Sequence, residues 1–393
     1  MPQYAHSPLE GVPVPSQTPP CPVCGSLNDG VEVGKLGRFG MDVRSIVCHD
    51  CTLVYQSPRP DEPAMAKYYA GTYRKHYGDV GCSTSDGRIV MKGDSEYKKV
   101  LECWHDTQAT IAMRLSPLKA NEKILEIGCR NARTLALMRE RADVEIYGIE
   151  PGPEEAEQAR TAGVNCFTGN LQEYEPREEK FDQIQLFHVL EHLHEPLRDL
   201  VQLRSWLKPQ GRIFIEVPNV YQPYGALELN FFQNAHLTNF SHKSLGELLR
   251  RAGFQVTSLA DTTTLYAVAI PADISQEALP LNFESNHLRA PEETSDWVAV
   301  RLRNYAEIQF MRQQTQGGQL TPEGLSRLCR AVRKPALLPH LIETVSQLAE
   351  DLVRGGSVSA AQLLVESAAQ GEHPQPVLDA FRKFSDQISA IAA

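Results

Sequence analysis

Residues 124–138, ILEIGCRNARTLALM, hold the features that decide the fold. A short apolar run contains the acidic residue Glu126, Gly128 follows two positions later, and a helical pattern begins shortly after it. A strand, a tight turn and a helix in this order are typical of the first unit of a ligand-binding α/β fold, where glycine lets a ligand approach the backbone. We therefore expect a ligand site at the end of this strand.

Short apolar runs and helix-like segments alternate around this stretch. An amphipathic helix is expected at residues 95–118, and the runs KILEIG, EIYGIE, CFTG, FDQIQLF and GRIFIEV are expected to be strands. This alternation predicts an α/β core with a doubly wound, mainly parallel sheet at residues 95–271. The second strand ends on Glu150, whose carboxylate can accept hydrogen bonds from both hydroxyls of a ribose. Asn170 and Leu171 follow the third strand and can flank a base.

Four cysteines form two closely spaced pairs near the start of the chain. They are Cys21 with Cys24 and Cys48 with Cys51, each pair in the pattern C-x2-C. Each pair presents two thiolates from one turn, and two such turns can bind Zn²⁺ tetrahedrally. Because four cysteines close the metal's shell, we expect a structural zinc ribbon at residues 18–60 rather than a catalytic zinc. A redox dithiol is the minor alternative.

The remaining segments are assigned by composition. Residues 1–17, with many Pro and Ser residues, are expected to be a disordered lead-in, and the Tyr-rich residues 61–94 a connecting or lid segment. Residues 272–393 lack the alternation of the core and are expected to form a helical C-terminal region. Its helices are predicted at 291–316, 321–334, 336–355, 358–370 and 375–392. Adjacent helices of this kind can offer a surface for a homo-oligomer or a protein partner.

The net charge of the chain and its N-terminal sequence argue against several classes of function. The formal net charge of −10 argues against a nucleic-acid substrate, because phosphate binding needs clustered Lys and Arg. No apolar run approaches the ~20 residues of a membrane span, and the N-terminus lacks the basic and apolar regions of a secretory signal. Nine cysteines, an odd number with clustered pairs, fit metal binding in a reducing cytosol. We expect a cytoplasmic protein.

Eight stretches within residues 20–260 resemble the class I S-adenosylmethionine (SAM)-dependent methyltransferases, in particular a bacterial subgroup with a four-cysteine zinc ribbon. The stretches are CPVCG, CHDCTLVYQSPRP, KYYAGTYRKHY, LEIGC, YGIEP, FDQIQLFHVLEHLHEPL, LKPQGRIFIEVPN and AHLTNFSHKSLGELLRRAGF. The resemblance implies a Rossmann-like core with SAM as cofactor. The residues that it assigns to the cofactor are Tyr73, Glu126, Gly128, Cys129, Arg130, Glu150, Pro151, Asn170, Leu171 and His188.

The first motif departs from the family pattern. Arg130 and Ala132 stand where the family usually has its second and third glycines. We expect Arg130 either to point away from SAM or to pair with the cofactor's carboxylate, to which a guanidinium can bind in a bidentate manner. The alternative is a degraded site in a non-catalytic assembly module.

Three histidines are the candidate catalytic residues, namely His236, His188 and His192. His236 follows the fifth strand and is the best candidate for a base. Sugar C-methyltransferases with the same ribbon typically carry Tyr-x-Glu-His there, and Gln233 and Ala235 stand in place of the Tyr and Glu. This loss favours O-methylation of a sugar, a glycan or another small molecule, with sugar C-methylation as an alternative.

The spacing of His188, Glu191 and His192 also matches the H-x-x-E-H motif of inverzincin metalloproteases. That motif belongs within a longer helix, where the two histidines share one face. Because the strand-like IQLF directly precedes His188, we expect the metalloprotease interpretation to fail.

Overall fold

The computed structural model describes residues 19–27, 29–38, 41–69, 82–83, 89–90, 94–272, 294–316, 321–334, 338–355 and 357–392. They divide into two compact units. One contains Met1–Leu27, Pro58–Pro218 and Phe240–Ser285, and the other contains Asn28–Ser57, Asn219–Asn239 and Asn286–Ala393. Each unit is described by itself, and the domain boundaries expected from the sequence stay predictions.

The first unit is built on a seven-stranded sheet with the order β12-β13-β10-β9-β6-β7-β8. Its strands are β6 (Lys123–Ile127), β7 (Glu145–Glu150), β8 (Asn165–Thr168), β9 (Phe181–Phe187), β10 (Leu207–Pro218), β12 (Phe254–Asp261) and β13 (Thr264–Pro271). The strands from β8 to β10 pair in parallel, whereas β13 is antiparallel to β10 and β12. The predicted α/β fold with a mainly parallel sheet is confirmed, and an antiparallel hairpin completes one edge. The same unit has a small hairpin of β4 (Cys82–Ser83) and β5 (Ile89–Val90).

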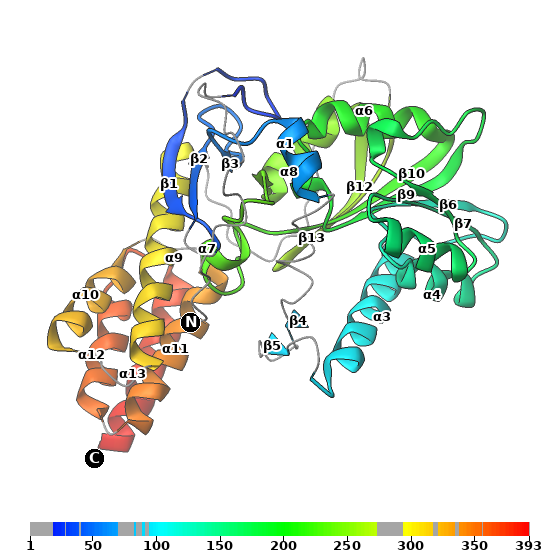
Figure 1. Ribbon diagram of the computed structural model, residues 1–393. Coiled ribbons are helices and arrows are strands. Elements are labelled where there is room, and N and C mark those ends of the chain that lie inside the picture. The colour runs from blue at the N-terminus through cyan, green and yellow to red at the C-terminus, as the bar shows by residue number, and fades with distance from the viewer. Residues whose placement is uncertain are drawn as a thin grey trace. The chain divides into compact units, whose positions relative to one another are not determined.

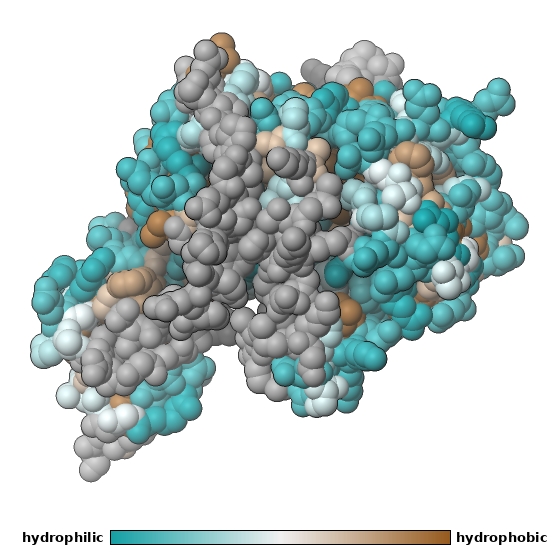
Figure 2. Space-filling model, viewed as in Figure 1, coloured by the Kyte–Doolittle hydropathy of each residue, from teal (hydrophilic) through white to brown (hydrophobic). Residues whose placement is uncertain are grey.

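Helices cover both faces of this sheet (Figure 1). The helices on one side are α3 (Tyr97–Leu115), α4 (Arg133–Arg141) and α5 (Pro153–Thr161), and those on the other side are α6 (Pro196–Trp206) and α8 (His242–Arg251). A further helix, α1 (Glu62–Lys67), begins at the N-cap Asp61. Each long helix turns an apolar stripe inward, as with the buried Leu200 and Leu203 of α6. The outer faces of α5 and α6 are mostly hydrophilic in Figure 2.

The second unit contains a four-stranded antiparallel sheet with the order β1-β2-β3-β11. The strands are β1 (Val31–Leu36), β2 (Asp42–Val47), β3 (Val54–Gln56) and β11 (Thr238–Asn239), and the short helix α7 (Leu227–Asn230) precedes β11. Val33 and Val47 of this sheet share a buried cluster with Val298 and Leu302 of helix α9 (Ser295–Gln316).

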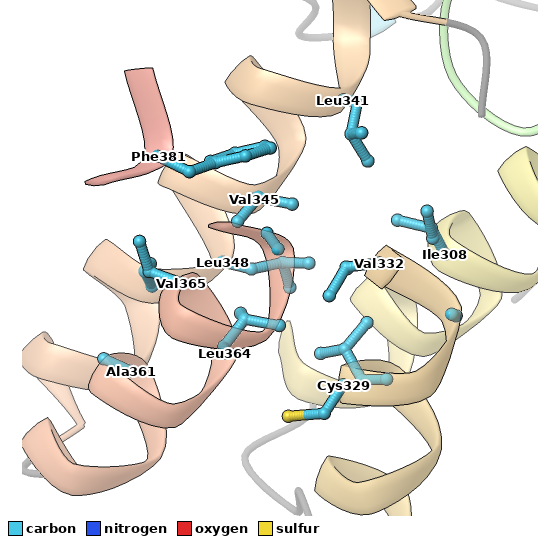
Figure 3. Close-up of a cluster of buried hydrophobic side chains, with 14 of the residues drawn as sticks. Ile308, Cys329, Val332, Leu341, Val345, Leu348, Ala361, Leu364, Val365 and Phe381 are labelled. Carbon is cyan, nitrogen blue, oxygen red and sulfur yellow. The ribbon is translucent and has the colours of Figure 1, made fainter. Parts of the chain in front are cut away.

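The rest of the second unit is helical, as expected. Its helices are α9, α10 (Pro322–Arg333), α11 (Leu338–Arg354), α12 (Val358–Ala369) and α13 (Gln375–Ala392). They enclose a common apolar core in which Val345, Leu348, Leu364 and Phe381 are fully buried (Figure 3). Among the described residues, no helix has the length and apolar character needed to cross a membrane.

We predict that Leu348→Ala lowers the free energy of unfolding of the helical region by about 2–5 kcal/mol, because it leaves a cavity in a packed core. Leu363→Ala, on the 47% exposed face of α12, is the matched control and should change it by less than about 0.5 kcal/mol. Denaturant unfolding followed by circular dichroism measures both. Equal effects of the two substitutions would show that the core in Figure 3 is not packed as described.

Candidate cofactor site

The order in which the chain adds strands to the sheet reverses between β6 and β9. From β6 it proceeds to β7 and β8 on one side, and it then returns to β9 and β10 on the other. In open α/β sheets, ligands bind beside the carboxyl ends of the strands at such a switch point. The residues at this edge are Glu126 near the end of β6, Glu150 at the end of β7, His188 directly after β9 and Glu216 near the end of β10.

The turn after β6 keeps the backbone conformation of a glycine-rich loop. Gly128, Arg130 and Ala132 have φ angles of +67°, +52° and +56°, all in the left-handed region. Glycine is required at the first of these, because a Cβ on Gly128 would lie 2.8 Å from Cγ2 of Val189. Arg130 and Ala132 therefore preserve the shape of the motif at a cost in backbone energy.

Glu150 ties this turn to the loop after β7. Its carboxylate oxygens accept hydrogen bonds from the backbone N–H of Arg130 at 2.9 Å and from that of Gly152 at 2.8 Å. The side chain is buried, so these bonds hold the carboxylate in one position at the strand end. This is where the sequence predicted an acceptor for ribose hydroxyls. Arg130 contributes its backbone here and is exposed, so its role toward a cofactor stays a prediction.

Glu126 is a buried carboxyl group next to the same turn. Burial raises its pKa to about 8, and the nearby Glu216 and Glu150 add to this effect. The amide of Gln185 opposes it by donating a hydrogen bond of 2.8 Å to Oε2 of Glu126. A small change in its surroundings can therefore change the charge of Glu126 near neutral pH.

His188 lies between two buried carboxylates. Its Nε2 is 2.9 Å from Oε1 of Glu216, and its Nδ1 is 3.4 Å from Oε1 of Glu191. Burial lowers the pKa of His188, but the two carboxylates outweigh burial and raise the pKa to about 10. The imidazole therefore carries a positive charge at neutral pH. The ring of Trp104 lies beside it, with centroids 6.0 Å apart.

The geometry of this segment contradicts the metalloprotease interpretation. His188 has a left-handed φ of +52°, and the residues that follow form only the short 3-10 helix η4 (Leu190–His192). His188 and His192 therefore do not share the face of one helix. Nδ1 of His192 instead lies 3.1 Å from the hydroxyl of Tyr69.

The other predicted cofactor residues lie around the ends of β6, β7 and β8. Leu171 is buried and begins the 3-10 helix η3 (Leu171–Glu173), while the N–H of Asn170 donates to Glu173 at 2.7 Å. Pro151 is exposed between Glu150 and α5. Cys129 is buried, and its sulfur forms a hydrogen bond of 3.7 Å with the sulfur of Cys166. This bond and burial raise the pKa of Cys129. Tyr73 lies outside the described residues.

His236 belongs to the second unit, where it is buried before β11. Its N–H donates to the carbonyl of Gln233 at 3.0 Å, and its own carbonyl accepts from the side-chain amide of Gln56 at 2.9 Å. The backbone at His236 is therefore held firmly. Its role as a base stays a prediction.

Sequence reasoning missed four polar groups of this edge, namely Gln185, Glu216, Trp104 and His105. A signal was present in the first two, because each interrupts an apolar core strand. His105 sits on α3 with its Nδ1 3.2 Å from the hydroxyl of Thr134, and burial lowers its pKa to about 4. It is therefore neutral at physiological pH, unlike His188.

The four cysteine sulfurs of the predicted ribbon, from Cys21, Cys24, Cys48 and Cys51, lie within 4.8 Å of one another. In a tetrahedral site with Zn–S bonds of about 2.3 Å, sulfurs are about 3.8 Å apart, so this donor set fits zinc. Both turns have knuckle-like bonds: the N–H of Gly25 donates to Cys21 O at 2.8 Å, and that of Thr52 to Cys48 O at 3.1 Å.

Comparison with known proteins agrees with this architecture. The model of a methyltransferase domain family matches residues 104–259. The tRNA U34 carboxymethyltransferase of Campylobacter hominis is 28% identical over 129 residues, which are 30% of this chain and 45% of that protein. The enzyme of the same name from Idiomarina loihiensis is 26% identical over 168 residues, or 39% and 51%. The chain spans about half the length of these curated relatives.

Among solved structures, the 1,6-didemethyltoxoflavin-N1-methyltransferase of Burkholderia thailandensis, with bound S-adenosylhomocysteine (SAH), is similar at 21% identity and a TM-score of 0.39. The match covers 57% of this chain and 97% of that one.

We predict that Arg130→Gly stabilises the protein relative to Asn131→Gly by about 1 kcal/mol. A left-handed φ costs a residue with a side chain roughly 1–2 kcal/mol, which exceeds the entropy that glycine adds to the unfolded chain. Asn131 is the matched control, since it is exposed and its φ is not positive. Thermal unfolding of the two variants measures the difference, and the reverse order would contradict the described turn.

Proposed function

We propose that this chain, whose residues 104–259 are a class I SAM-dependent methyltransferase domain, methylates a hydroxyl group of a sugar, a glycan or another small molecule. The observation that carries the proposal is the fixed carboxylate of Glu150. It stands at the end of β7, it is tied to the left-handed turn after β6, and it is buried at the switch point of the sheet. An acceptor in this place suits the two hydroxyls of the cofactor's ribose.

The charge of the site supports a cationic cofactor. Glu150, Glu191 and Glu216 are buried at this edge of the first unit, and the cationic His188 lies between Glu191 and Glu216. Bound SAM supplies an electrophilic methyl group on a positively charged sulfur. Carboxylates in a setting of low dielectric attract such a charge, and they hold the product, whose sulfur is uncharged, less strongly. The described residues of the edge thus favour exchange of product for fresh cofactor.

We further propose that His236 accepts the proton of the acceptor hydroxyl. Methyl transfer to oxygen needs removal of one proton, whereas the rest of the catalysis comes from positioning. The firmly held backbone of His236 suits a base that must stay in place. Gln233 and Ala235 replace the Tyr and Glu expected for sugar C-methylation, which makes that reaction the weaker alternative.

A tRNA acceptor is the second candidate, because the curated relatives are named as tRNA U34 carboxymethyltransferases. The net charge of −10 opposes it, since tRNA binding requires a positive surface. A non-catalytic assembly module is the third candidate, suggested by Arg130 and Ala132. The retained left-handed turn opposes it.

Calorimetry with SAM and SAH tests the cofactor site. We expect wild-type protein to bind both, and Glu150→Ala to weaken binding at least 100-fold, because it removes the ribose acceptor and the clamp on the turn. Glu154→Ala, on the exposed first turn of α5, is the matched control and should bind normally. Folded wild-type protein that binds neither compound would overturn the proposal.

Turnover is tested by incubation with methyl-labelled SAM and pools of sugars, glycans, other metabolites and tRNA. We expect label in a small-molecule pool, and we expect His236→Ala to lose most of the rate while it still binds SAH. Label in tRNA alone would favour the second candidate. Binding without transfer to any pool would favour the assembly module.

We also propose that Cys21, Cys24, Cys48 and Cys51 hold one structural Zn²⁺. Metal analysis should find about one zinc per chain in wild-type protein and a marked loss in Cys48→Ser. A chelator should lower the melting temperature, because binding of a structural zinc contributes directly to folding. Cys103→Ser, an exposed cysteine on α3, is the matched control and should keep the metal. Wild-type protein without zinc, or a Cys48→Ser variant that retains it, would contradict this assignment.

A further inference from the structure

We propose that a buried chain of hydrogen bonds, from Arg212 through Ser116, Gln183 and Gln185, positions the carboxylate of Glu126 at the cofactor turn. The inference deepens the proposed function and rests on it for the identity of the ligand. It assigns these side chains as positioning residues, since they act on the ligand through Glu126. The chain of bonds itself is a property of the described residues.

The links are continuous and point in one direction. Nε of Arg212 donates to the hydroxyl of Ser116 at 2.6 Å, and that hydroxyl donates to Oε1 of Gln183 at 2.6 Å. Nε2 of Gln183 donates to Oε1 of Gln185 at 3.0 Å, and Nε2 of Gln185 donates to Oε2 of Glu126 at 2.8 Å. A guanidinium can only donate, so Arg212 fixes the direction of every hydrogen bond that follows it in the series.

The series of hydrogen bonds begins at the opposite ends of the strands, where Arg212 is held by several partners. Arg212 donates to both carboxylate oxygens of Glu122, at 3.0 Å and 2.8 Å, and to the carbonyl of Pro117 at 2.9 Å. Glu122 directly precedes β6, and Glu126 lies near its end. The series of hydrogen bonds therefore follows the strand direction from the mostly buried Arg212–Glu122 ion pair to the turn that follows β6.

The burial of the chain argues for a role beyond packing. Gln183 and Gln185 are fully buried on β9, and Ser116 is 1% exposed. An apolar strand would have been simpler to bury, because each amide costs free energy unless all its bonds are made. Here one donor of each group continues the series toward Glu126, and bonds that polarise one another in a low dielectric strengthen the last one. Gln185 thus favours the charged form of Glu126. Because it also holds Oε2, the orientation of the whole carboxyl group is fixed.

The charged state of Glu126 would matter for a ligand with an ammonium group, such as the methionine end of SAM. Around Glu126, the carboxylates of Glu216 on β10 and Glu150 on β7 disfavour its charge, and Arg130 on the turn favours it. Gln185 is the group on β9 that opposes burial. Loss of its N–H should therefore keep Glu126 protonated to a higher pH.

The test measures the titration of Glu126 directly in the full chain without cofactor, by carbon NMR of glutamate carboxyl groups, with Glu126→Gln identifying the signal. We expect Gln185→Leu to raise the midpoint by at least about half a pH unit, because the carboxylate loses its donor. Ser116→Ala, a milder change at the far end, should raise it by a smaller amount. Ser244→Ala is the matched control: it removes a buried hydroxyl from the cap of α8, remote from this chain, and should leave the midpoint unchanged. Equal midpoints in wild type, Gln185→Leu and Ser116→Ala would overturn the proposal.

A second measurement separates this inference from the proposed function. The affinity for SAH is followed from pH 6 to pH 9.5, and the acidic limb of the profile should move to higher pH in Gln185→Leu and not in Ser244→Ala. A profile that is unmoved while the NMR midpoint rises would overturn the role in cofactor binding. If wild-type protein binds neither SAM nor SAH, the proposed function fails, and the NMR titration alone decides whether the chain positions Glu126.

Discussion

The two hydrogen bonds to the carboxylate of Glu150 are the constraint on which the candidate site depends. One comes from the turn after β6 and the other from the loop after β7, so a single side chain connects these two segments. The N–H groups of Gly128 and Cys129 add bonds from the turn to the carbonyl of Ile149. The turn after β6 contains left-handed residues that would relax if released. The two hydrogen bonds of Glu150 therefore hold a strained turn in place, and the turn also keeps the carboxylate in position.

The same edge of the sheet gathers more acidic groups than a stable core would contain by itself. Glu126, Glu191 and Glu216 are all nearly inaccessible to water, and the cationic His188 lies against Glu191 and Glu216. Burial raises the pKa of Glu126, and the neighbouring carboxylates of Glu216 and Glu150 raise it further. An arrangement that is costly without a ligand and complementary to a cation is the signature of a site selected for binding rather than for stability.

Much of the fold could be predicted from the sequence, because the spacing of apolar residues and the residues that end helices and strands are local features. Short patterns indicate the strands that carry Glu126 and Glu150, the four cysteines and the helices after residue 294. The polar chain could not be predicted. Its members come from β6, β9, β10 and the residue that follows α3, and nothing in the sequence fixes which amide faces which neighbour. The conformation of Arg130 was also hidden, since a residue type that disfavours a left-handed φ gives no hint of adopting one.

The position of β11 has a consequence for how the second unit is made. Thr238 and Asn239 complete the edge of a sheet whose other strands lie within residues 31–56. This edge therefore cannot pair until more than 180 further residues have been synthesised. Until then, β3 exposes unpaired backbone groups that can attract another strand. A ribbon cut out at residue 60 would keep this open edge permanently, which makes the isolated fragment prone to self-association. Pairing across such a long stretch of chain also delays folding of this sheet relative to the helices that follow.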